Sequence, residues 1–166
     1  MYFHNAYKEL VESDAFKKFK DEHKDAFLSV GFIMLGEENI DWQFGFYDKE
    51  KDLIYTFFVN KDSARFDRED KVFKEPDKEI LEIDVDKIKI DLEDVVLKLD
   101  KIVTESYPKE EITKQMLIVQ KDKDLGEIWN ATLITKAFNA INIKIDASDG
   151  SVIVNKIMPV MGFQKS

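Results

Sequence analysis

Residues 26–59 read AFLSVGFIMLGEENIDWQFGFYDKEKDLIYTFFV and contain three apolar runs. The polar stretches GEEN and KEKD separate these runs, and stretches of that length and composition join neighbouring antiparallel strands. Because apolar residues alternate along each run, every strand can bury one face against a core. The segment therefore predicts a three-stranded antiparallel meander.

Period-two alternation assigns one core-facing set of side chains to each strand of this meander. We expect these faces to form a single core against a helix. The sets are Leu28, Val30, Phe32 and Met34 in the first strand, Trp42, Phe44 and Phe46 in the second, and Leu53, Tyr55, Phe57 and Val59 in the third.

The segment before the meander, residues 3–24, has apolar residues at helical spacing with charged residues between them. The phase of this pattern slips near Ser13, which precedes Asp14 and can act as a new N-cap. One kinked helix and two short helices both fit the pattern.

Residues 61–80 are crowded with charges and include Pro76, which predicts a linker between an N-terminal unit (1–60) and a C-terminal unit (81–166). Residues 80–90 can add a short strand. Residues 91–106 then predict a helix capped by Asp91, and Pro108 marks its end. Four further strands are expected in the runs TKQMLIVQK, EIWNATLIT, NAINIKID and SVIVNKI.

The order of a helix followed by three strands thus occurs twice, and the second copy has an additional strand. Trp42 and Trp129 occupy the same place in the two copies, and Tyr47-Asp48 before KEKD parallels Ile145-Asp146 before ASDG. We expect an α+β protein built as an internal repeat, with two tandem units that each have an antiparallel sheet covered on one face by a helix.

The sequence IKIDASDGSVIV at residues 143–154 could form either a metal loop or a bend between two strands. Asp146, Ser148 and Asp149 do not have the spacing of calcium ligands, and the distal glutamate of such loops is missing. Alternating apolar residues flank the segment, and Gly150 tolerates a positive φ. The pattern favours a hairpin.

Residues 87–157 resemble the PepSY domain. The resemblance rests on the helix in IKIDLEDVVLKLDKIV, on the strand EIWNATLIT with Trp129, and on the Asp-x-x-x-Gly hairpin formed by Asp146 and Gly150. Residues 3–59 form a more degenerate copy, in which Asp48 is present but Asp52 and Leu53 stand where a glycine is expected. The resemblance implies small α+β modules, often extracytoplasmic, that bind or inhibit proteins and carry no catalytic residue.

Composition excludes several classes of protein. The net charge of -9 and the scattered lysines oppose nucleic-acid binding. The absence of cysteine excludes disulfides and thiolate metal sites. No apolar run is long enough for a membrane span. The N-terminal sequence MYFHNAYKEL does not have the pattern of a signal peptide, so we expect a soluble chain that is cytoplasmic as given, or extracytoplasmic if it has been trimmed.

The sequence offers few groups for catalysis. His4 and His23 have no metal-ligand partner at suitable spacing, and His23 is expected to be a solvated residue at a helix end. Acidic residues in pairs could act as general acid and base if they shared a cleft, but solvated turns are the expected use. These pairs are Glu37 with Glu38, Glu110 with Glu111, and Asp84 with Asp86.

The sheet face opposite the core mixes polar and apolar residues, which suits contact with a partner. The residues on that face are Gln43, Gly45, Tyr47, Asn130, Thr132, Ile134, Asn142 and Lys144. We expect a non-enzymatic module that binds a protein or peptide, with an inhibitory or regulatory role, and with no catalytic, metal or cofactor residues. The alternatives are a hydrolase that uses acidic residues in a cleft and a homodimeric structural protein that pairs through a sheet edge.

Overall fold

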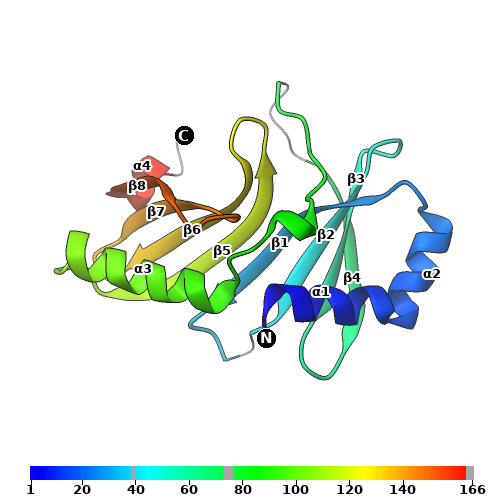
Figure 1. The fold of residues 1–166 in the computed structure, drawn as a ribbon, viewed down its shortest axis with the longest axis horizontal. Helices are drawn as coiled ribbons and strands as arrows, with labels where there is room; N and C mark the ends of the chain where they lie inside the picture. Colours follow the sequence, from blue (N-terminus) through cyan, green and yellow to red (C-terminus); the bar gives the residue numbers. More distant parts are fainter. Residues whose placement is uncertain (39, 73–76, 164–166) are drawn as a thin grey trace.

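A computed structural model describes residues 1–38, 40–72 and 77–163, excluding the side chains of 162 and 163. The chain is a mixed α+β protein with one antiparallel sheet of eight strands in the order β4-β3-β2-β1-β5-β6-β7-β8 (Figure 1). The strands are β1 (Phe27–Leu35), β2 (Trp42–Asp48), β3 (Leu53–Val59), β4 (Ala64–Lys71), β5 (Ile112–Asp122), β6 (Gly126–Thr135), β7 (Asn139–Asp146) and β8 (Val152–Pro159).

Two short helices precede the sheet, α1 (Phe3–Glu12) and α2 (Asp14–Glu22). Ser13 separates them, and its hydroxyl accepts a hydrogen bond from the backbone N–H of Phe16 at 3.2 Å. Of the two arrangements that fit the sequence, the two-helix arrangement is therefore the one that forms. The third helix, α3 (Leu92–Ser106), is capped as predicted by Asp91, whose carboxylate accepts from the backbone N–H of Leu92 at 2.6 Å.

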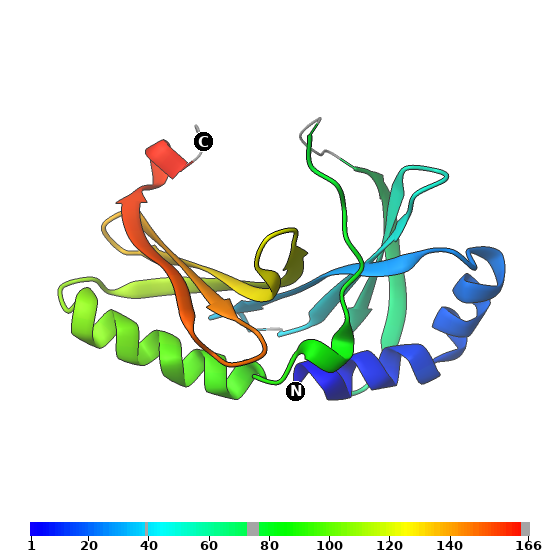
Figure 2. The same cartoon turned by 45° about the horizontal axis from the view of Figure 1, so that its top comes forward.

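The helices α1, α2 and α3 lie on the same face of the sheet, and the core fills the space between them and the strands (Figure 2). A fourth helix of four residues, α4 (Val160–Phe163), follows β8. Phe3 of α1 occupies the centre of this core. Its ring lies 5.4 Å from that of Trp42, 5.5 Å from that of Phe44 and 6.3 Å from that of Trp129. One helical side chain thus contacts strands from both halves of the chain.

Trp42 and Trp129 make equivalent hydrogen bonds. The indole N–H of Trp42 donates to the carbonyl of Met1 at 3.0 Å, and that of Trp129 donates to the carbonyl of Ile90 at 2.9 Å. Each acceptor lies two residues before the first residue of a helix, α1 or α3. Each tryptophan therefore fixes the entry of one helix onto the sheet.

The two predicted sheets are in fact one. β1 pairs with β5, from Val30 opposite Gln120 to Leu35 opposite Gln115, so the strands of both halves form one continuous ladder. Both strands carry apolar residues on both faces, which suits a central position. Each half supplies a helical segment followed by four strands, because the first half also contains β4.

The predicted linker at 61–80 is wrong for residues 64–71, which form β4 and pair with β3. Edge strands tolerate charged side chains because one side of the strand faces solvent, so the dense charge of this segment did not prevent a strand. Residues 73–76 of the predicted linker lie outside the described residues. The short strand predicted at 80–90 does not form, and that segment contains a 3-10 turn at Val85–Lys87.

The predicted core face of the first strand is also wrong. The register between β1 and β2 shifts between Leu28 and Val30, which marks a β-bulge. Leu28 is buried in the core, but beyond the bulge the core positions are Gly31 and Ile33. Val30, Phe32 and Met34 consequently point away from the helices. The predicted core faces of β2 and β3 are confirmed.

The hairpin predicted at DASDG is confirmed. β7 and β8 are antiparallel, and Gly150 has a φ of +76°. The Asp146 carboxylate accepts from the backbone N–H groups of Ser148 and Asp149. In the first half, Asn60 accepts from two backbone N–H groups in the β3–β4 turn in the same way. The topological counterpart of Asp146 is therefore Asn60 rather than Asp48, which closes the β2–β3 turn.

Replacing either tryptophan by phenylalanine tests the two helix-entry hydrogen bonds. We expect Trp42→Phe and Trp129→Phe each to lower the free energy of unfolding by at least about 1–3 kcal/mol, since a part-buried carbonyl oxygen loses its donor and the smaller ring also leaves buried space unfilled. Urea denaturation followed by circular dichroism measures the change. Tyr2→Phe, which removes an exposed hydroxyl hydrogen bond to Glu93, is the control and should cost much less. Equal costs in all three variants would contradict the assigned role.

Candidate functional site: the open face of the sheet

We call the sheet face opposite α1, α2 and α3 the open face. One row of directly paired residues crosses all eight strands on this face. It starts at the β4 edge, passes through the paired central strands β1 and β5, and ends at the β8 edge. Its members, in order, are Arg65, Phe58, Gln43, Phe32, Ile118, Asn130, Lys144 and Val154.

The centre of the open face is apolar. Phe32 pairs with Ile118 and Met34 pairs with Met116, and all four side chains are only partly buried. The solvent-facing side of an antiparallel sheet is usually polar, and contiguous exposed apolar surface commonly marks an interaction site. We call these four residues the central strip.

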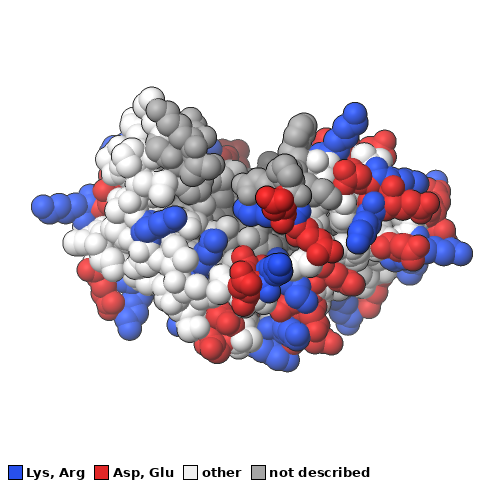
Figure 3. Space-filling view, turned by 90° about the horizontal axis from the view of Figure 1, so that it is seen from above, with Lys and Arg blue, Asp and Glu red and all other residues white. Residues whose placement is uncertain are grey.

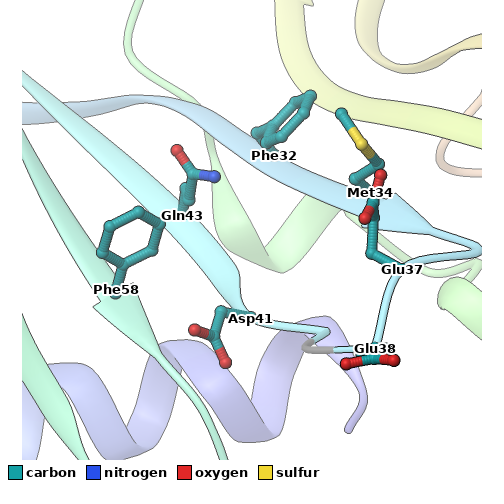
Figure 4. A pocket seen from close by; sticks show the side chains of 7 residues that line it. All are labelled: Phe32, Met34, Glu37, Glu38, Asp41, Gln43 and Phe58. Carbon is teal, nitrogen blue, oxygen red and sulfur yellow. The ribbon is translucent and has the colours of Figure 1, made fainter.

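A groove of about 560 Å³ lies beside the central strip (Figure 4). Phe32, Met34, Gln43 and Phe58 line it from strands β1, β2 and β3, and the β1–β2 connection adds carboxylates. Of these carboxylates, Glu37 forms an ion pair with Lys114 at 2.6 Å. The remaining lining residues are Glu38 and Asp41. The groove thus has a floor of three apolar side chains and Gln43, and an acidic rim.

The other side of the central strip is rich in amides. Asn142 donates through its side-chain nitrogen to the side-chain oxygen of Asn130 at 2.8 Å and to the backbone carbonyl of Ala131 at 3.1 Å. These two bonds use both hydrogens of the Asn142 amide and fix the orientation of the Asn130 oxygen. Lys144 pairs with Asn130 across the ladder and is half-buried.

The two arginines of the chain lie on β4, at one edge of the open face. Arg65 stacks over the ring of Phe58, with its guanidinium carbon 4.7 Å from the ring centroid. Arg68 forms ion pairs with Asp67 and Asp70. Neighbouring carboxylates thus compensate the positive charge at this edge.

Charged side chains are unevenly distributed over the face of the molecule that Figure 3 shows. Acidic and basic side chains crowd the right-hand side of this view, whereas its left-hand side is mainly uncharged and has a few separate charged side chains.

The pairing registers place the partner-facing residues predicted from the sequence on the open face. Sequence reasoning missed Val30, Phe32 and Met34, which it assigned to the core. The signal that could have revealed them is Ile33, an apolar residue in the opposite phase of the same run. Ile33 is 1% exposed in the core.

His23 is not the solvated residue that the sequence predicted. Its side chain is 13% exposed, and its ring lies 4.9 Å from that of Phe19 and 4.4 Å from that of Tyr55. Its Nδ1 is 3.5 Å from a carboxylate oxygen of Asp48. His4 lies apart from it and makes a 2.7 Å contact with the carbonyl of Ile88.

The paired carboxylates lie at separate places. Glu37 and Glu38 line the groove. Glu110 accepts from the side chain of Asn139 at 3.0 Å and also has a buried oxygen without a hydrogen-bond partner, whereas Glu111 pairs with Lys136 on the surface. Asp84 caps the 3-10 turn by accepting from the backbone N–H of Asp86. Among the described residues, no cluster of three or more His, Cys, Asp or Glu side chains could hold a metal ion.

Both edges of the sheet carry features that oppose further strand pairing. β4 has a register shift between its partners Thr56 and Phe57, together with many charged residues. β8 has a shift opposite Lys144 and Ile145, carries Lys156, and ends at Pro159. Bulges, edge lysines and prolines are known to block edge-to-edge association of sheets.

Comparison with known proteins identifies the fold but no family. No family model and no curated protein matches the chain. A solved structure from Clostridium difficile 630, described as a "putative lipoprotein", superimposes with a TM-score of 0.54 and 18% identity. The match covers 90% of this chain and 99% of the other. The two chains therefore share a fold over nearly their whole length.

The described helices are too short or too polar to cross a membrane.

The Asp48 carboxylate should give the fold a pH-dependent contribution. Burial alone would raise the pKa of Asp48, but hydrogen bonds from the backbone N–H of Lys51, the His23 ring and the backbone N–H of Glu50 together hold that pKa below its ordinary value. A lowered pKa in the folded state adds stability above the unfolded pKa of about 3.9, and this stability is lost as the pH falls through the folded pKa.

We therefore expect Asp48→Asn to destabilise the protein at pH 7, and the difference in unfolding free energy from wild type to shrink below about pH 4. Urea denaturation at a series of pH values measures this difference. Asp100→Asn, on the exposed side of α3, is the control. A difference that stays constant between pH 7 and pH 3 would show that the carboxylate charge contributes nothing.

Proposed function

We propose that this chain is a non-catalytic module that binds a protein or peptide segment on the open face. The observation that supports this proposal most strongly is the central strip of Phe32, Met34, Met116 and Ile118 on the face opposite the helices. Burying such side chains contributes about 25 cal/mol per Å² of apolar area. The amide and charged groups around the strip can position a partner.

The blocked sheet edges favour binding through the face over binding through an added strand. The bulges in β4 and β8, with the charged residues of β4 and with Pro159, disfavour backbone pairing with a second chain at either edge. For this reason we rank homodimerisation through a sheet edge below face binding.

The proposal includes an internal duplication in which each unit is a helical segment followed by four strands. The matched hydrogen bonds of Trp42 and Trp129 support it, as do the matched turns at Asn60 and Asp146. We also retain the proposal that residues 87–157 are PepSY-like. The description of the Clostridium difficile protein as a "putative lipoprotein" supports an extracytoplasmic location.

A hydrolase that uses the groove carboxylates is the weaker alternative. Glu38 and Asp41 line the groove with Glu37, but Glu37 is exposed and neutralised by Lys114. A general acid needs a desolvated carboxyl group whose pKa is raised towards the working pH. The groove supplies an acidic rim that suits recognition better than proton transfer.

Selection from a displayed library of random 12-residue peptides tests binding on the open face. We expect wild-type protein to enrich peptides that Phe32→Lys binds at least tenfold more weakly, a loss of about 1.4 kcal/mol, because the lysine places a charge in the central strip. Fluorescence anisotropy with labelled selected peptides measures the dissociation constants.

The matched control is Leu97→Lys, which places the same charge on a side chain of α3 that is 64% exposed on the helical face. Circular dichroism confirms that both variants are folded. Peptides that lose affinity for Leu97→Lys but not for Phe32→Lys would place binding on the helical face and refute the proposal.

A further inference from the structure

We infer that the amide-rich side of the open face is a carboxylate-binding subsite, centred on Lys144, for an acidic residue of the bound peptide. The inference rests on the proposed function and specifies the chemistry of the partner. Lys144 lies in the second half of β7, the strand next to the β8 edge, and its side chain is half-buried.

Lys144 has no ion pair among the residues that the structure describes, although the chain contains 34 acidic residues. Asp146 lies two residues along the same strand, but one of its oxygens already accepts three hydrogen bonds from Ser148 and Asp149 in the β7–β8 turn. A half-buried ammonium group is better stabilised when a carboxylate pairs with it than when only partial hydration remains.

Other donors surround Lys144. The Asn130 oxygen is held by Asn142, which leaves the amide hydrogens of Asn130 without an acceptor among the described residues. Lys156 pairs with Asn142 and is thus a diagonal neighbour of Lys144 on the open face. Lys156 also has no ion pair within the described part of the chain. Two ammonium groups and one amide thus belong to residues at neighbouring positions on the open face.

The part of the open face on the other side of the central strip carries acidic groups instead of basic ones. The groove beside β2 and β3 is rimmed by Glu37, Glu38 and Asp41. A carboxylate would be repelled there and attracted at Lys144, so the face distinguishes the two directions in which a peptide could lie. Electrostatic complementarity between a peptide and the two ends of this face would fix the orientation of the peptide more than it would raise its affinity.

The geometry of the row sets a spacing for the peptide. Ile118, Asn130 and Lys144 are directly paired neighbours on β5, β6 and β7. Strands are about 4.8 Å apart, so Ile118 and Lys144 are separated by roughly 10 Å, which an extended peptide spans in about three residues. An acidic residue should therefore occur two to four positions from an apolar residue that covers the central strip.

The library selection described above can test this prediction with charge-reversed protein. We expect wild type to enrich Asp or Glu at that spacing from an apolar residue. The double variant Lys144→Glu with Lys156→Glu should instead enrich Lys or Arg at the same place. The control, Lys101→Glu with Lys109→Glu, makes the same change of net charge at exposed positions in α3 and the loop after it, and should select the wild-type pattern.

A double-mutant cycle on one selected peptide adds a quantitative test. Lys144→Met and replacement of the acidic peptide residue by its amide should each weaken binding about tenfold, and the two changes together should cost little more than either alone. Additive losses, or selected peptides that lose affinity for Phe32→Lys yet contain no acidic residue, would overturn this inference and leave the proposed function standing. If Phe32→Lys weakens no selected peptide, the proposed function itself fails.

Discussion

The pairing of β1 with β5 is the constraint on which the rest of the structure depends. It joins two four-stranded meanders into one sheet with a fixed register from Val30 opposite Gln120 to Leu35 opposite Gln115. Because the register fixes the faces of both strands, it also requires α1 and α3 to cover the same side. Phe3 can then contact both Trp42 and Trp129. The two halves of the chain therefore share a single hydrophobic core.

The bulge after Leu28 determines which side chains of β1 lie on the open face. Without it, Phe32 and Met34 would continue in the phase of Leu28 and enter the core, as simple alternation predicts. The bulge reverses that phase and brings Gly31 and Ile33 inward instead. Gly31 is suited to this place because a side chain there would begin 2.9 Å from the ring of Phe3. The apolar character of the open face is thus linked to the close packing of α1.

The features that the sequence predicted well are local ones. Ser13 and Asp91 mark helix starts because their side chains cap backbone groups a few residues away, and Gly150 marks a hairpin because its φ is positive. The union of the two sheets depends on contacts between distant segments, and the bulge and the pairing of β4 depend on how each strand pairs with its neighbour in the sheet. A charged run such as 64–71 indicates a strand only when a neighbouring strand is available to pair with it. The same contrast applies to the candidate site. Period-two alternation correctly predicted that Asn130 and Lys144 lie on the open face, but it assigned Phe32 to the core.

Several side chains on the open face are held in place by packing and by hydrogen bonds. A side chain at Gly45 would begin 2.6 Å from Val30 and 2.8 Å from Ile54, so these two residues pack over the glycine and close the floor between β1 and β3. Asn130 and Asn142 are likewise fixed by their mutual hydrogen bond. Side chains that are already ordered lose little conformational entropy when a partner arrives. A partner that matches this surface would therefore meet a largely preformed site, and specificity would follow from where its apolar and acidic groups fall along the row from Phe32 to Lys144.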